Sequence, residues 1–256
     1  MDRITQPRVV FNDLVKLRLP RTIAAAAGAA LAALAAASPA SAIITEIGPS
    51  GAQATSLPSC PTDCIAVTRT TGYQAKVNGT RELYTVPRKG RIVAWSITLG
   101  NPGERQREFF ADNFGGASRA AISVLAPVGE RKRDVERRTL ARSPFVRLGP
   151  FFGSTVQFPL LEALRVEKGQ IIALTVPSWA PALAPGQPTE TSWRASRSEN
   201  CTDQATTQLQ TAQKPGDSAM YKCHYRTARL TYSALLISTV PQPTSGSTEA
   251  AAESSR

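Results

Sequence analysis

The chain has 256 residues, a hydrophobic fraction of 42% and a formal net charge of +11, from 30 basic and 19 acidic residues. The hydrophobic fraction is too high for a wholly disordered chain, and a single histidine excludes a metal centre with several histidine ligands. The length accommodates one domain of ordinary size together with additional segments.

Residues 1–42 have the three parts of a secretory signal peptide. Basic residues come first, an alanine-rich apolar run spans Thr22 to Ala37, and Ala40-Ser41-Ala42 matches an A-x-A cleavage site. The run is shorter than the roughly 20 residues of a membrane-spanning helix, although an uncleaved anchor is the alternative. We therefore expect a secreted or cell-surface protein with no transmembrane segment in the mature chain. The leader holds five basic and two acidic residues, so the mature chain keeps +8 of the +11.

Two segments flank the predicted domain of the mature chain. Residues 43–59 contain glycine and proline at four positions and are predicted to form an irregular lead-in. Residues 241–256 have almost no apolar bulk and are predicted to be disordered. One domain is therefore expected over residues 60–240, and no internal repeat divides it.

The cysteines of an exported chain are expected to form disulfides. The four cysteines allow three connectivities, of which we favour Cys60–Cys64 and Cys201–Cys223 because each pair is close in sequence. The second bond would close a polar segment and stabilise the fold by about 3 kcal/mol on the chain-entropy model. A zinc site is the alternative, but the spacing lacks the usual C-x2-C pairs. The sequence predicts no metal and no cofactor.

Apolar residues of the domain mostly recur with a period of two, which is typical of half-buried strands. The clearest alternation is in 91–99, 119–125 and 226–237, whereas 171–176 is a nearly continuous apolar run, as in a central strand. Weaker strands are predicted at 64–70, 73–77, 82–86, 135–148, 155–159 and 192–196. Frequent glycine and proline between short strands favour an all-β fold, an antiparallel β-sandwich of the jelly-roll-like kind.

One short helix interrupts the strands. Asn101 suits the N-cap, Pro102 the first helical position and Glu104 the capping-box position. The helix is expected to run to about Asn113 and to end at Gly115-Gly116. Three aromatic residues are expected to hold it against the sandwich: Phe109, Phe110 and Phe114.

Two motifs resemble a group of known domains. The stretch from Val86 to Trp95 has the pattern "vP..G.v..W", and the stretch from Leu164 to Leu174 has the pattern "L.V..Gd.i.l". Together they resemble uncharacterised secreted jelly-roll-type β-sandwich proteins of high-GC Gram-positive bacteria, over about residues 64–237. The resemblance implies a fold and no catalytic residue, because its motifs are a turn glycine, a core tryptophan and apolar alternation.

Catalytic arrangements are weakly represented. His224 directly follows Cys223, and a strand histidine beside a disulfide is more often packed than catalytic. Glu104, Glu108 and Asp112 are spaced four residues apart and line one face of the predicted helix. The simpler interpretation is a solvent-exposed row of carboxylates, and the alternative is a pair of carboxylates for glycan hydrolysis.

Two tryptophans are candidate platforms for a sugar ring. Trp179 lies in a proline-rich loop just past a strand, and Trp193 opens a polar strand beside Arg194. An indole with a neighbouring arginine stacks on planar or sugar groups. The alternative is that both indoles fold back onto the core.

A basic cluster is the sharpest local feature. Residues 130–147 hold seven basic and three acidic residues. On a strand, Arg131 and Arg133 would point one way, and Arg138 and Arg142 would share a parity, so that a stripe could hold a polyanion. The alternative is a solvated hairpin whose charge protects a sheet edge.

These features predict a non-catalytic module outside the cytoplasm that binds an anionic cell-wall polymer or a carbohydrate. A structural envelope protein without a specific ligand is the second hypothesis, and a glycan-active enzyme is the third. Specific nucleic-acid recognition is not expected, because the chain carries none of its motifs.

Overall fold

The computed structural model describes residues 42–48, 56–129, 135–199, 201 and 209–239, which form a sandwich of antiparallel sheets. The first sheet contains β1 (Ala42–Ile47), β4 (Gly90–Thr98), β8 (Thr155–Val166) and β15 (Tyr232–Thr239). The second contains β2 (Val67–Val77), β3 (Thr80–Arg81), β5 (Arg119–Pro127), β6 (Glu136–Arg142), β7 (Val146–Arg147), β9 (Ile171–Ala180), β11 (Ser192–Ala195), β12 (Ser218–Met220) and β13 (Cys223–Arg226). The remaining elements are the strand pair β10 (Leu183–Pro185) and β14 (Ala228–Leu230), helix α2 (Glu104–Phe114) and the 3-10 helix η1 (Gly149–Phe151).

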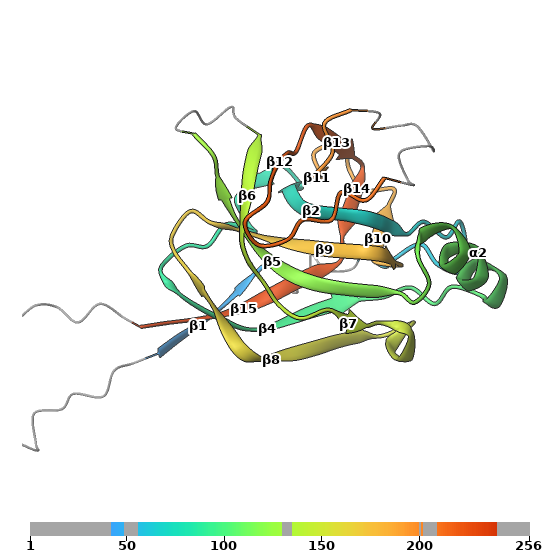
Figure 1. Ribbon diagram of the computed structural model, residues 1–256, viewed down its shortest axis with the longest axis horizontal. Coiled ribbons are helices and arrows are strands. Elements are labelled where there is room, and N and C mark those ends of the chain that lie inside the picture. Colours follow the sequence, from blue (N-terminus) through green and yellow to red (C-terminus); the bar gives the residue numbers. More distant parts are fainter. Residues whose placement is uncertain (1–41, 49–55, 130–134, 200, 202–208, 240–256) are drawn as a thin grey trace, which may run out of the picture. The chain divides into compact units, whose positions relative to one another are not determined.

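Neighbouring strands follow the orders β1-β15-β4-β8 and β12-β6-β5-β9-β2-β11-β13, with β3 beside β2 and β7 beside β5. Figure 1 shows the first sheet beneath the second and α2 at one end of the sandwich. The chain changes sheet between β4 and β5, between β7 and β8, and again between β8 and β9. This alternation agrees with the jelly-roll-like sandwich predicted from the period of two.

The core lies between the two sheets. The alternating apolar residues of β4, among them Trp95 and Ile97, are buried against Ile122 of β5 and Leu174 of β9. Burial of each such large side chain is worth about 1.5–3 kcal/mol relative to exposure, so this layer supplies most of the drive to fold. Trp95 is a core residue, as its place on the apolar face of its strand predicted.

Helix α2 begins later than the sequence predicted. Its N-cap is Gly103, whose backbone N–H donates to Oε1 of Gln106 at 2.8 Å, and the side chain of Asn101 instead accepts from Arg107. The predicted end is confirmed, because Gly115 has φ of 102° and its N–H donates to Ala111, a left-handed geometry that favours glycine. Phe110 and Phe114 are buried as expected, whereas Phe109 is 57% exposed.

The predicted lead-in over 43–59 is wrong for its first part. Residues 42–47 form β1, which pairs antiparallel with β15 from Ala42 opposite Thr239 to Ile47 opposite Ala234. Five residues with alternating exposure precede the buried Ile47, a pattern of an edge strand that the nearby Gly48 and Pro49 obscured in the sequence. The folded unit therefore starts before residue 60.

The long strand predicted over 226–237 is three strands in three sheets. Thr227 has φ of 55°, and the break there separates β13 from β14. A second break at Thr231 separates β14 from β15, which pairs with β4 across the sandwich. The apolar alternation continues through both breaks, so periodicity alone did not show them.

Both favoured disulfides are present, Cys60–Cys64 and Cys201–Cys223. Residues 209–217 lie across the second sheet, where the N–H of Thr211 donates to Arg69 and that of Gly216 to Thr139, each to a backbone carbonyl. The described part of the chain contains no helix of the length and apolarity needed to cross a membrane. The predicted tail, 241–256, lies outside the described residues.

Candidate functional site

Trp179 does not offer a face to a sugar ring. Its side chain is 3% exposed and packs between α2 and the turn after η1, with Phe110 at 5.1 Å and Phe152 at 5.5 Å between ring centroids. Its indole N–H donates to the carbonyl of Gly116 at 2.8 Å. The predicted exposed loop is the end of β9, and helix α2 covers it, so the platform hypothesis fails for this residue.

Trp193 is also a core residue, and it is separated from Arg194 by the sheet. It is 5% exposed and stacks on Tyr225 at 4.5 Å, whereas Arg194 lies opposite Tyr73 and His224 on the other face. Successive side chains of a strand point to opposite faces, so the expected pairing of this indole with its neighbouring arginine is wrong.

The two described residues of the predicted arginine clamp, Arg138 and Arg142, do not form a stripe. Arg131 and Arg133 lie outside the described residues. In β6 the ladder with β5 skips Leu140, a bulge that places Arg142 opposite Ser123 and Arg138 opposite Ala126. These two partners are three residues apart on β5, so Arg138 and Arg142 occupy opposite faces and their expected shared parity is wrong.

Arg142 has a structural role where the strap of residues 209–217 crosses the sheet. Its guanidinium lies 4.2 Å above the ring of Phe145 and donates to the carbonyl of Gln213 at 2.8 Å. Burial lowers the pKa of Arg142, and the nearby carboxylate of Asp217 partly offsets this effect. The contacts hold the strap in place, so this side chain is not available to grip a polymer.

A different basic cluster lies on the outer face of the second sheet. Arg226, Ser192, Lys76 and Arg81 are opposite one another in successive strands β13, β11, β2 and β3. Because directly opposed residues share a face, their side chains form one row, and Arg194 and His224 form a second row beside it. We call the five basic residues of these rows the cationic face: Lys76, Arg81, Arg194, His224 and Arg226.

The electrostatic environment of His224 agrees with this grouping of the cations. Burial is the largest cause that lowers its pKa, followed by the charges of Arg194, Arg226, Lys76 and Arg81. Every charged group that contributes to this shift is a cation. The histidine is therefore neutral over more of the pH range than usual, and the site combines concentrated positive charge with one titratable member.

The sequence pointed to Arg194 as a ligand contact and to His224 only as a weak catalytic candidate, and it pointed to no other member of this cluster. The other members are far apart in the chain, and each is an unremarkable polar residue of a strand. The register of four strands brings them together, and the bulge between Ser192 and Trp193 sets which of their neighbours share the face. No window of the sequence carries that signal.

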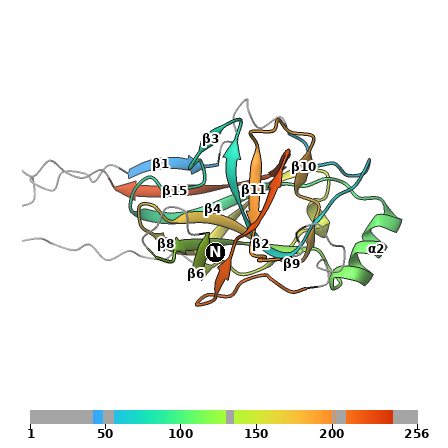
Figure 2. The same ribbon diagram turned by 90° about the horizontal axis from the view of Figure 1, so that it is seen from above.

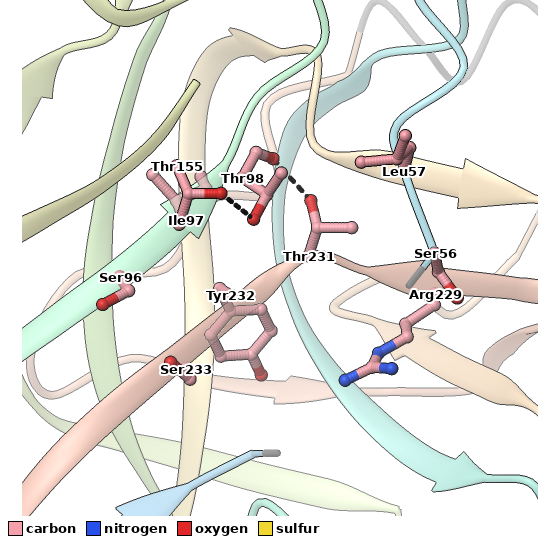
Figure 3. Close-up of a pocket in the computed structure, with 10 residues that line it drawn as sticks. All are labelled: Ser56, Leu57, Ser96, Ile97, Thr98, Thr155, Arg229, Thr231, Tyr232 and Ser233. Atoms are coloured by element: carbon pink, nitrogen blue, oxygen red, sulfur yellow. Dashed lines mark hydrogen bonds between the residues drawn. The ribbon is translucent and has the colours of Figure 1, made fainter. Parts of the chain in front are cut away.

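A small pocket lies at the β4–β15 side of the sandwich (Figure 3). Its volume is about 200 Å³, and Figure 3 shows Arg229 and Ser56 across from a group of threonines. The hydroxyl of Thr231 donates to the carbonyl of Thr98, whose own hydroxyl is 2.9 Å from that of Thr155. The space holds roughly six water molecules, which suits a small polar molecule and not a polymer.

Arg229 lines this pocket and is only 4% exposed. This burial was not expected, because Arg229 belongs to an alternating segment whose polar residues were predicted to face solvent. It forms a hydrogen bond with the hydroxyl of Tyr84. Burial raises the pKa of Tyr84, the charge of Arg229 opposes that shift, and Glu46 of β1 adds to it. The guanidinium thus belongs to a buried polar cluster, as expected for a charge removed from water.

The carboxylates proposed for glycan hydrolysis do not line a cleft. Glu104, Glu108 and Asp112 are all exposed on α2, and none of them borders the pocket of Figure 3. Among the described residues, no three histidine, cysteine or acidic side chains gather as a metal site.

Comparisons of this chain with protein-family models, with curated proteins and with solved structures find no match.

Proposed function

We propose that the chain is a non-catalytic binding module that acts outside the cytoplasm and holds an anionic polymer of the cell envelope on its cationic face. The observation that carries the proposal is the row of Arg226, Lys76 and Arg81 beside Arg194 and His224. Concentrated charge of one sign on a rigid sheet attracts and orients an oppositely charged ligand.

The size of the row favours a polymer over a single ion. Neighbouring strands are about 4.8 Å apart, so a row across four strands spans roughly 14 Å. A ligand that places several negative groups along this distance meets several cations at once. Charge-assisted hydrogen bonds of this kind are the stronger ones, and arginine is well suited to carboxylate and phosphate groups.

The cationic face also lacks neutralisation within the described residues. The ion pair found among the described residues joins Lys89 to Glu167 at 2.9 Å, and neither of these two residues belongs to the cationic face. The proposed location rests on the leader pattern of residues 1–42 and agrees with two disulfides, which persist in oxidising surroundings.

The test is retention of the protein on an anionic polysaccharide. We expect binding to immobilised polygalacturonate that weakens steeply with salt, and no binding to neutral dextran. The triple variant K76Q/R81Q/R226Q should bind about tenfold or more weakly at low salt, because it removes three cations and leaves the Arg194 hydrogen bond to Tyr221 intact.

A matched control removes the same charge elsewhere. Arg88, Arg91 and Arg165 are exposed at the β4–β8 side of the first sheet, and the variant R88Q/R91Q/R165Q should retain nearly full binding. Equal loss in both variants would mean that net charge alone attracts the polymer. Retention that is insensitive to salt would contradict the proposal.

A further inference from the structure

We infer that the chain has a second, apolar site beside α2 that takes a free single-chain fatty acid, with its carboxylate at two adjacent arginines. The site is a hollow of about 620 Å³, which is within the range of small-molecule pockets. Its wall comes from α2 and the segment that follows it, from Arg147 to Phe152, and from Trp179 at the end of β9. These elements are separate from those of the cationic face.

The lining of the hollow is mainly apolar. Its apolar side chains are those of Ala111, Ala117, Pro150, Phe152 and Trp179. Such a surface favours an alkyl chain, because each buried methylene gains about 0.8 kcal/mol. Glycine adds to the space, since a side chain built at Gly149 or Gly116 would meet no atom within 4 Å.

The hollow is formed before any ligand arrives. Ser178 donates through its hydroxyl to the carbonyl of Ala117 at 2.8 Å, and Ser118 donates to the carbonyl of Trp179 at 2.8 Å. Together with the indole bond to Gly116, these contacts fix the segment after α2 against the end of β9. A preorganised wall reduces the entropy lost on binding.

Positive charge lies at the rim of the hollow. Arg147 borders the hollow and lies directly opposite Arg119 in the β5–β7 ladder, so both guanidinium groups share a face. Neither side chain has a hydrogen bond or ion pair with another described residue. Two like charges directly opposite are unfavourable, and a bound carboxylate would remove that penalty.

A third arginine, Arg107 of α2, also lines the hollow. The guanidinium of Arg107 lies 5.2 Å from the ring centroid of Phe152 and is oriented by hydrogen bonds to Pro102 and Asn101. The carboxylates of α2 form no ion pair with these arginines in the described structure. The site therefore combines an apolar interior with a cationic rim, the complement of an alkyl carboxylate.

The concave shape favours a free fatty acid over a membrane surface. Trp179 is 3% exposed, so its contribution lies at the bottom of the hollow and not at a protruding tip. A planar bilayer would meet only the rim, whereas a single chain can enter.

The experiment measures binding of monomeric decanoate to the protein by calorimetry, with decanol and decyltrimethylammonium as neutral and cationic comparators. We expect one decanoate per chain and at least about tenfold weaker binding of both comparators. The variant R119Q/R147Q should weaken decanoate binding about tenfold and leave decanol unchanged. R105Q, an exposed change on α2 outside the lining, should leave both unchanged.

Filling the hollow is the second arm. A117L alters an exposed residue of the lining, and A111L/A117L also adds bulk on α2; each should weaken decanoate and decanol alike. The absence of decanoate binding, binding unchanged by both filling variants, or binding to anionic phospholipid vesicles without decanoate binding would each overturn the inference. K76Q/R81Q/R226Q should bind decanoate normally, so this test and that of the polymer fail independently.

Discussion

Tyr221 and Tyr232 are both buried, but their hydroxyls differ. That of Tyr232 donates to the carbonyl of Ile172 at 2.9 Å, whereas that of Tyr221 has no partner among the described residues. Burial raises the pKa of both phenols, so both stay protonated over the physiological range. The hydroxyl of Tyr232 therefore contributes a hydrogen bond, whereas the hydroxyl of Tyr221 is buried without a hydrogen-bond partner among the described residues.

We expect Y232F to lower the free energy of unfolding by about 1 kcal/mol, the net worth of a typical hydrogen bond. Y221F should leave the free energy unchanged or raise it, because it removes a desolvated hydroxyl and keeps the ring contact with Tyr73 at 5.4 Å. Denaturant unfolding of the two variants measures the difference. An equal loss in both would show that the Tyr221 hydroxyl is bonded in solution.

His224 is the only histidine, so its proton is easily followed by NMR. Its pKa should lie below the ordinary value of about 6.5, because burial and four cations disfavour the imidazolium. Between the folded and unfolded pKa values the unfolded chain binds more protons. Stability should therefore fall as pH decreases from about 6.5 to the folded pKa, and the loss should then level off.

The same titration reports on the cationic face. K76Q/R81Q/R226Q should move the pKa of His224 upward, and bound polygalacturonate should do so in the wild-type protein. R88Q/R91Q/R165Q serves as the control and should leave the pKa in place. A pKa at or above 6.5 in the free wild-type protein would show that the cations do not face this histidine.

At the scale of elements, the strap of residues 209–217 depends on the disulfide that joins Cys201 to Cys223, the first residue of β13. The strap buries hydroxyls of the second sheet, where the N–H of Gln213 donates to Oγ1 of Thr71, and Thr71 in turn is bonded to Thr175. Cys201–Cys223 closes a span of 22 residues around it, whereas Cys60–Cys64 closes only 4. Longer loops gain more from closure.

We expect C201A/C223A to lower the free energy of unfolding by about 3 kcal/mol and C60A/C64A by about 2 kcal/mol on the chain-entropy model. C201A/C223A should also make the strap more susceptible to proteolysis, because the segment that contains it is no longer closed by the disulfide and opens more often. Denaturant curves and limited digestion check both statements. A larger loss in C60A/C64A would point to a role of the short disulfide loop in holding α2, because the side-chain amide of Gln106 in α2 donates to the carbonyl of Pro61 in that loop at 2.8 Å.

At the scale of the whole molecule, the predicted leader of residues 1–42 ends in the sequence at the first residue of β1, the strand that lies beside β15 (Figure 2). Cleavage after Ala42 removes only the first residue of this strand, so Ile43 to Ile47 keep their partners in β15. In an exporting host we expect a mature N-terminus at Ile43. A40F should block processing and S41F should not, because the A-x-A rule constrains only the outer positions. N-terminal sequencing decides between a cleaved leader and an anchor.

Local sequence determined much of this protein. Apolar alternation predicted the strands around Trp95 and Ile122, a nearly continuous apolar run predicted the strand around Leu174, glycine predicted the end of α2, and cysteine spacing predicted both disulfides. Except for Cys201–Cys223, whose cysteines are 22 residues apart, these features depend on neighbours within a few residues. The periodicity of 226–237 correctly predicted strand structure but did not indicate the two breaks. A chain can pass from one sheet to another without changing the alternation of its apolar residues.

Only the tertiary structure decided the surfaces. It buried Trp179 under α2 and Trp193 between the sheets, and the bulge at Leu140 divided the predicted arginine stripe. It also assembled the cationic face from four strands and placed Arg119 opposite Arg147. The physical reason is that a sheet face is set by register, which depends on partners distant in the chain, and one inserted residue reverses which side chains point outward.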